Sequence, residues 1–219
     1  MDMYKAEEVP RAAKPVQPET VRLHPEADAI LAVHDDAIPH VRKEFFVSSA
    51  VLIAASNYFR ALLRSDFREG LETRRGDCPT ILMGEDDPEA METILSLLHY
   101  RNVESYDRLD PKALAAVALQ SDKYDCTRAL RPWLSHWFRS VSETSNADEL
   151  RFLLVAAYFF HASEHFIEIS ARVIRQAKAD LESVWANHDM ITLLPQEIKG
   201  ATRRTRSPSA GRLRDYQTH

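Results

Sequence analysis

The chain has 219 residues, 45% of them hydrophobic, so it is long enough to bury the core of one domain or of one and a half. It contains two cysteines, Cys78 and Cys126, which excludes a disulfide scaffold or a cysteine-rich zinc site and predicts two small packing residues. The formal net charge of −5 argues against a protein that binds nucleic acid over its whole surface.

The start of the chain and its hydropathy pattern predict an intracellular protein. Residues 1–24 carry Pro10, Pro15 and Pro18 among mixed charges without a sustained period, and we expect a disordered leader there. They lack the apolar core of a secretory signal, and no apolar run approaches the roughly 18 residues of a membrane span. We therefore expect a cytoplasmic and/or nuclear location and no membrane partner.

A β-hairpin and two helices are predicted next. Alternating apolar residues indicate strands at about residues 29–34 and 41–47. The period then changes from two to 3.6, which predicts a short apolar helix. A second helix is expected to begin near Asn57 and to be closed by Gly70 with positive φ.

A third strand and two further helices follow in the sequence. Residues 66–79 are charged and predict an irregular loop, after which residues 80–83 alternate as a strand. Pro88 and Pro111 suit the first turns of two helices whose apolar residues recur at the i, i+3, i+4 spacing. Between these helices Asn102 is expected to take a left-handed turn.

The last part of the chain predicts helices and then a basic tail. One helix begins at Thr127, with Pro132 about in its first turn. Apolar residues at helical spacing predict a helical hairpin after it, and a last short helix is expected from Pro195. Residues 199–214 carry six basic residues and no acid. A solvated end is the favoured interpretation, and a nuclear address or a patch for nucleic acid or acidic lipid stays open.

Seven residues carry a resemblance to a known family: Phe45, Val47, Val51, Leu52, Ser56, Tyr58 and Phe59. They match the Phe-x-Val strand, the Val-Leu helix and the Ser-x-Tyr-Phe sequence of the BTB/POZ domain. Residues 28–33 and 80–83 are similar to the first and third strands of that family, and residues 87–100 and 121–124 to its third and fourth major helices. The resemblance covers about residues 28–140.

The resemblance implies an α+β fold with a small three-stranded sheet, capped by a helical cluster and followed by an α-helical hairpin. This hairpin resembles that of fungal BTB proteins. We expect four regions: a disordered leader, a BTB/POZ domain, a C-terminal helical extension and a basic disordered tail, over residues 1–24, 25–141, 147–198 and 199–219.

The resemblance further implies a non-enzymatic protein–protein interaction module without a cofactor. Phe67-Arg68-Glu69 stands where cullin-binding BTB adaptors carry a hydrophobic-x-Glu motif, in which the apolar residue fills a pocket on the cullin and Glu accepts hydrogen bonds. This predicts Phe67 and Glu69 as contacts to the cullin of a ubiquitin ligase. The other interpretation is that Phe67 closes the helix onto the core and Glu69 is solvated.

A BTB scaffold or self-associating protein in transcription or chromatin regulation is the alternative function, with a homo-oligomer as the expected assembly. In repressor members of the family a basic residue pairs with the Asp of the first strand, here Asp28, and forms a charged pocket for corepressors. Ser49 stands in its place, so we expect Asp28 to begin a strand instead. The chain lacks a DNA-reading module, and nucleic acid is not an expected partner.

A short histidine string raises a third class, zinc hydrolase. His161, Glu164 and His165 match the H-x-x-E-H string of one metalloprotease class, in which two His hold zinc and Glu activates water. The helical pattern breaks at residues 161–163, however, and Ser163 is better placed as an N-cap than inside a helix. A turn between two helices is therefore favoured, and we expect neither a metal site nor an enzyme.

Overall fold

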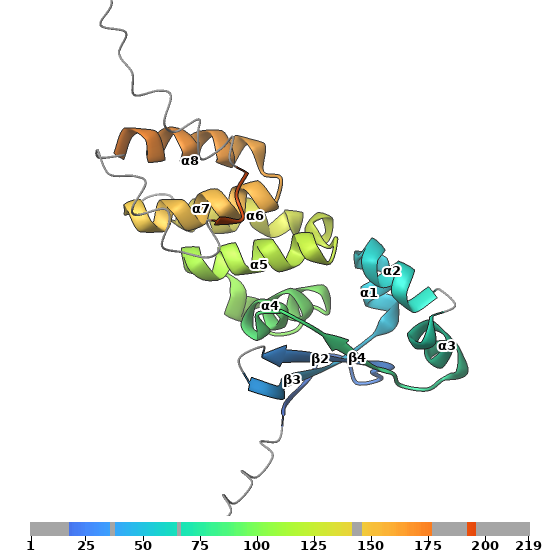
Figure 1. Cartoon of the computed structure of the whole chain (residues 1–219). Coiled ribbons are helices and arrows are strands. Elements are labelled where there is room, and N and C mark those ends of the chain that lie inside the picture. The colour runs from blue at the N-terminus through green and yellow to red at the C-terminus, as the bar shows by residue number, and fades with distance from the viewer. Residues whose placement is uncertain (1–17, 36–37, 65–66, 142–145, 177–191, 196–219) are drawn as a thin grey trace, which may run out of the picture.

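The computed structural model describes residues 18–35, 38–64, 67–141, 146–176 and 192–195. It shows a mixed α+β fold, with a small sheet at one end and helices stacked on one side of it (Figure 1). The expected α+β class and the helical hairpin after the domain are confirmed. The predicted basic tail, and the helix expected from Pro195 onward, lie outside the described residues.

The sheet has the strand order β1-β3-β2-β4. Strands β2 (Ala29–Asp35) and β3 (Ile38–Val47) form the predicted antiparallel hairpin. Strand β4 (Thr80–Met83) lies parallel to β2, and β1 (Glu19–Arg22) lies parallel to β3. The core face of the sheet is held by buried side chains at paired positions across three strands, among them Leu31, Phe45 and Ile81.

The fourth strand differs from the sequence prediction. Strand β1 lies inside residues 1–24, which we expected to be a disordered leader, so the sheet has four strands in the described part of the chain and not three. Three of its four residues are exposed, and no apolar alternation marks it in the sequence. The strand is held by backbone pairing with β3, with Val21 opposite Phe45, and by the buried side chain of Leu23 that follows it.

Three short helices follow the hairpin: α1 (Ser49–Ala55), α2 (Asn57–Arg64) and α3 (Arg68–Arg75). The prediction that one helix runs from Asn57 to Gly70 is wrong, because α2 ends at Arg64 and Gly70 lies inside α3. The left-handed position belongs instead to Gly76, whose φ of 83° closes α3. Most of the expected irregular loop at residues 66–79 is therefore helical.

Helices α4 (Pro88–Leu98) and α5 (Pro111–Lys123) begin as the sequence predicts. The carboxylate of Asp87 accepts hydrogen bonds from the N–H groups of Glu89 and Ala90, and that of Asp110 from Ala113. A proline occupies the first position of both helices, where a missing N–H costs no hydrogen bond. These local signals fix both starts.

The connection between these helices contains the short 3-10 helix η1 (Val103–Tyr106). Asn102 precedes it with φ 49°, which confirms the predicted left-handed turn. Tyr100 has φ 53° and is 83% exposed. Two residues of this connection therefore have a left-handed backbone, which residues other than glycine rarely adopt.

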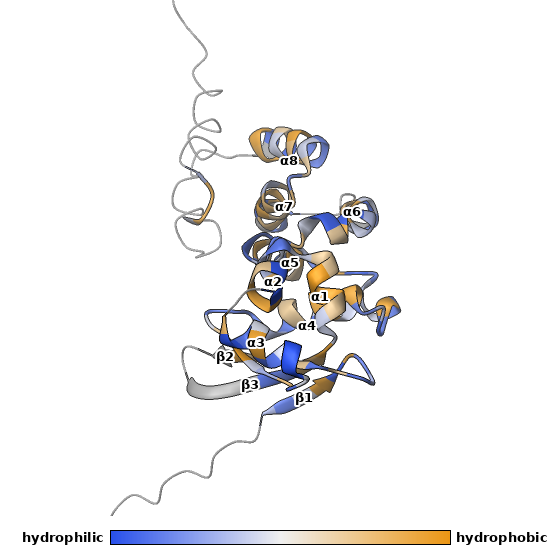
Figure 2. Cartoon of the chain, turned by 90° about the vertical axis from the view of Figure 1, so that its right-hand side faces the viewer, coloured by the Kyte–Doolittle hydropathy of each residue, from blue (hydrophilic) through white to orange (hydrophobic). Residues whose placement is uncertain are grey.

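The remaining helices extend the stack away from the sheet. They are α6 (Thr127–Val141), α7 (Ala147–Phe159) and α8 (Ser163–Gln176). Helix α5 packs on α4, α7 packs on α5, and α8 packs on α7, as Figures 1 and 2 show. Pro132 lies well inside α6, beyond the first turn where we expected it, and its side chain faces solvent.

Trp137 connects the helices of the stack. Its side chain is fully buried, and its ring centroid lies 5.9 Å from that of Phe160, the residue directly after α7. Its indole N–H donates to the backbone carbonyl of Tyr106 at 2.8 Å. Burying a large aromatic ring whose polar atom is also satisfied is strongly stabilising. The residue therefore ties η1, α6 and the end of α7 into one core.

Candidate protein-interaction surface

Phe67 lies immediately before α3 and points outward. Its backbone is extended, with φ −65° and ψ 159°, and its side chain is 63% exposed. An aromatic residue that closed the helix onto the core would be buried, so the structure favours an accessible role. Leu71, one turn later, is 38% exposed and continues the apolar surface along the helix. We call Phe67, Glu69 and Leu71 the α3 surface.

Glu69 occupies the first turn of α3, where a carboxylate also favours the helix dipole. Its side chain is 23% exposed, and one carboxylate oxygen lies 3.8 Å from the guanidinium of Arg68. Arg68 pairs as well with Glu72 at 3.7 Å, and its own side chain is 73% exposed. Solvated pairs of this length contribute about 0–1 kcal/mol, so Glu69 keeps the capacity to accept a further hydrogen bond.

The histidine string of the zinc-hydrolase alternative is split by the structure. His161 follows the end of α7 with φ 55°, and its ring lies 3.3 Å from the carboxylate of Asp122 on α5. His165 lies on α8 and stacks on Phe138 of α6 at 4.4 Å between ring centroids. The two histidines therefore contact different elements. The described residues contain no cluster of three or more His, Cys, Asp or Glu that could hold a metal ion.

The start of α1 is held by two long-range contacts that sequence reasoning missed. The carboxylate of Asp28 accepts from both the N–H and the hydroxyl of Ser49. The ring of His99 accepts from the N–H of Ser48 at 3.0 Å and contacts the carbonyl of Leu95 at 2.8 Å. Burial lowers the pKa of His99, with a further lowering by His24, so the neutral ring is favoured. Asp28 thus supports the start of α1.

A buried lysine joins the sheet to α4. The ammonium group of Lys43 lies 2.5 Å from Glu92, 2.8 Å from Glu89 and 3.8 Å from Glu19. Burial lowers the pKa of Lys43, but its hydrogen bonds to Glu89 and Glu92 outweigh that effect and the pKa is raised. The cluster connects β1, β3 and α4 and is structural.

A second polar cluster, built on the buried Asp86 and Tyr124, fixes the end of α5 against the loop before α4. The carboxylate of Asp86 accepts from the hydroxyl of Tyr124 at 2.6 Å and from the ammonium of Lys123 at 2.8 Å. Burial, followed by the bond to Asp86, raises the pKa of Tyr124 far above its usual value. These groups satisfy one another, so we read the cluster as a packing device and not as a reactive site.

A comparison with protein-family models agrees with the α+β fold described above. A family model of the BTB/POZ domain covers residues 22–131, about half of the chain. The chain belongs to the BTB/POZ family. BTB domains are protein–protein interaction modules, so this BTB protein is expected to act by binding protein partners. No curated protein matches the chain.

The match leaves part of the BTB protein outside the family model. It runs from the last residue of β1 into α6 and includes the α3 surface, whereas α7 and α8 follow it. Within the described ranges, no helix combines the length and the apolar character that crossing a bilayer requires. Helices α7 and α8 follow the match: α7 packs on α5, and α8 packs on α7.

Proposed function

We propose that this BTB protein is an adaptor that binds a cullin scaffold through the α3 surface. The observation that carries the proposal is the 63% exposure of Phe67 at the start of a well-defined helix. Exposed aromatic residues beside a positioned acceptor are typical anchors of protein interfaces. Phe67 supplies the apolar group of the hydrophobic-x-Glu motif and Glu69 supplies the acceptor.

The energetics of such a contact favour Phe67 as the main anchor. Burying a whole Phe side chain contributes about 1.5–3 kcal/mol, and most of the Phe67 side chain is available for that burial. Glu69 orients the partner, because a carboxylate that is fixed in the first turn of a helix accepts hydrogen bonds only from donors on one side. Leu71 widens the apolar contact.

The adaptor also needs a place to hold its client. The helices that follow the family match, α7 and α8, supply a surface that is distinct from α3. A cullin on α3 and a client on the helical extension give the two-sided arrangement that a ubiquitin ligase adaptor requires. We place this activity in the cytoplasm or the nucleus.

The test is binding of the full chain to the N-terminal region of a cullin, measured by isothermal titration calorimetry. We expect micromolar or tighter binding by the wild type and a loss of about tenfold or more for Phe67→Ala with Glu69→Ala. Leu82→Ala is the matched control, because Leu82 is equally exposed, at 66%, but lies on β4. Circular dichroism must show that each variant is folded.

Two results would reject the adaptor proposal. One is a wild-type chain that does not bind the cullin at micromolar concentration. The other is a Leu82→Ala variant that loses as much affinity as the α3 double variant. In either case a self-associating BTB scaffold takes its place, favoured by the exposed Leu82 on the edge strand β4. Sedimentation of the wild type and of Leu82→Ala then measures that association.

A further inference from the structure

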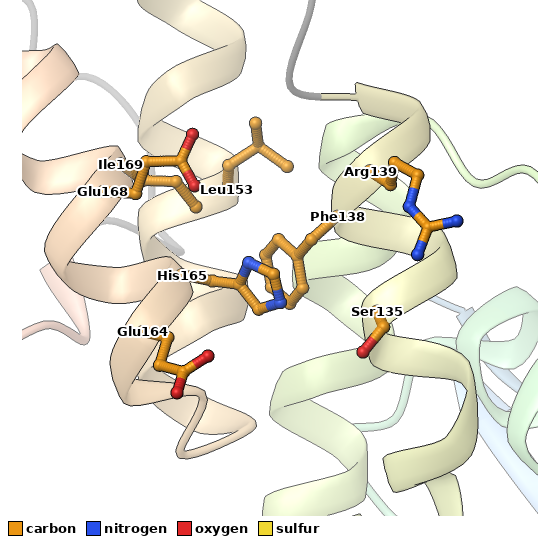
Figure 3. A pocket seen from close by; sticks show the side chains of 8 residues that line it. All are labelled: Ser135, Phe138, Arg139, Leu153, Glu164, His165, Glu168 and Ile169. Atoms are coloured by element: carbon orange, nitrogen blue, oxygen red, sulfur yellow. The ribbon is translucent and has the colours of Figure 1, made fainter.

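A cleft of about 340 Å³ opens between α6 and α8 (Figure 3). Helix α3 lies at the other end of the molecule from α8 (Figure 1). Its floor is apolar and consists of Phe138 from α6, Leu153 from α7 and Ile169 from α8, all almost fully buried. The volume suits one long side chain together with part of the backbone that carries it. We call this space the α6–α8 cleft.

One wall of the cleft is acidic. Glu164 and Glu168 lie one turn apart on α8, and Figure 3 shows both on the same side of the cleft. Both residues are exposed, and neither carboxylate makes an ion pair or a hydrogen bond with any residue that the structure describes. The pair therefore offers two carboxylates to a group that enters the cleft.

A flat aromatic platform lies beside this wall. The imidazole of His165 stacks on the ring of Phe138, with 4.4 Å between the centroids and 18° between the planes. Planar guanidinium groups stack on such rings, whereas a compact ammonium group gains less from them. The platform therefore adds a preference for arginine to the preference for positive charge.

The opposite wall carries no acidic residue among those that line the cleft. Ser135 and Arg139 lie one turn apart on α6 and line the cleft across from the two glutamates. Arg139 has an interaction of its own, and Ser135 adds a hydroxyl to this wall. The two glutamates therefore attract a cation to the α8 side of the cleft and repel an anion such as phosphate.

We propose that the α6–α8 cleft binds an arginine side chain from a basic segment of a partner protein. The guanidinium pairs with Glu164 and Glu168 and stacks on His165, while its aliphatic stem packs near Leu153. A metal ion does not fit the same groups, because the described residues hold no cluster of three ligands. The inference does not depend on cullin binding, since the cleft belongs to α6, α7 and α8.

The test uses the full chain and a small probe. N-acetyl-L-arginine amide is titrated into ¹⁵N-labelled protein and followed by NMR, with N-acetyl-L-citrulline amide as the uncharged probe of the same shape. We expect saturable shifts at Phe138, His165 and Glu168, with a Kd of about 1–10 mM for so small a ligand. The citrulline probe should produce no saturable shift.

Variants decide whether the carboxylates carry the binding. Glu164→Gln with Glu168→Gln should weaken binding of the arginine probe about tenfold. Glu104→Gln with Asp107→Asn is the matched control, because it removes the same charge from exposed positions outside the cleft and should leave the Kd unchanged. Equal binding of the citrulline probe, an unaffected cleft variant or an absence of saturable shifts would each overturn the proposal.

A last variant separates two sources of the arginine. The chain's own segment 199–214 is basic and is the competing occupant. A triple variant replaces three of these basic residues with glutamine: Arg203→Gln, Arg204→Gln and Arg206→Gln. If this variant binds the arginine probe about tenfold more tightly than the wild type does, the chain's own segment fills the cleft and the partner assignment is overturned. An unchanged Kd supports the partner protein as the source.

Discussion

The carboxylate of Asp28 accepts two hydrogen bonds from Ser49, one from its backbone N–H and one from its hydroxyl, both at 2.6 Å. The contact joins the residue before β2 to the first residue of α1. It places a negative charge at a helix N-terminus, where the charge is favourable. The hydroxyl and the N–H of Ser49 are thus both satisfied by one carboxylate at the start of α1.

Asp28→Ala should therefore lower the free energy of unfolding by about 1–2 kcal/mol, because the N–H of Ser49 loses its acceptor. Asp28→Asn keeps one carbonyl acceptor and should lose less. Urea denaturation followed by circular dichroism measures both. Equal losses for the two variants would show that the charge and not the hydrogen bond dominates.

The ring of His99 should make stability depend on pH. Its pKa in the folded chain lies below the ordinary 6.5, because burial and the nearby His24 disfavour the charged ring. The unfolded chain therefore takes up the proton more readily, and the contribution of His99, complete above pH 6.5, is lost as the pH falls from 6.5 toward the folded pKa. Urea denaturation between pH 8 and about pH 5 measures this loss.

His99→Gln is the control for this pH dependence, since its side-chain oxygen can still accept from the N–H of Ser48. The stability difference between wild type and His99→Gln should shrink as the pH falls. A difference that stays constant over that range would contradict the assignment.

Lys43→Met should lower the free energy of unfolding by about 1–3 kcal/mol. Methionine fills the same space, but the variant loses the charged hydrogen bonds to Glu92 and Glu89. The cost stays below that of a fully buried pair because Glu89 is 76% exposed and can be solvated. Thermal and urea denaturation measure this loss. The Glu89→Gln variant should change the free energy of unfolding by less than about 0.5 kcal/mol.

Phe67→Ala should leave the free energy of unfolding within about 0.5 kcal/mol of the wild type, because the side chain is mostly in solvent. Phe59→Ala, on the buried face of α2, should cost about 3–5 kcal/mol. Urea denaturation of the two variants compares the positions directly. A large loss for Phe67→Ala would mean that this residue belongs to the core.

Elements with local signals were predictable from the sequence. Helices α4 and α5 each begin with an aspartate followed by proline, which supplies the cap and the first φ angle within two residues. The β2–β3 hairpin is also local, and its apolar alternation gives the buried face. Such elements need no knowledge of the rest of the fold.

Elements that depend on distant partners were missed. Strand β1 is defined by its pairing with β3, and its own residues carry no alternation. Helix α3 has a charged sequence with Gly70 in its interior, which costs about 1 kcal/mol relative to alanine, and its terminus depends on the left-handed Gly76. The motif identified Phe67 as a candidate contact. Its exposure depends on how the chain is arranged between α2 and α3, which the neighbouring residues alone do not predict.

The stacking of α4, α5, α7 and α8 has a consequence for local unfolding. Each helix packs on the one before it, so α8 is the outermost helix of this stack and packs mainly on one neighbour, α7. Amide hydrogen exchange should accordingly be faster in α8 than in α7, and slower still in α5 and the hairpin strands. A ligand that bridges α8 to α6 would slow exchange in that outer helix while leaving the BTB core unchanged, so the outer end can open and close without loss of the fold.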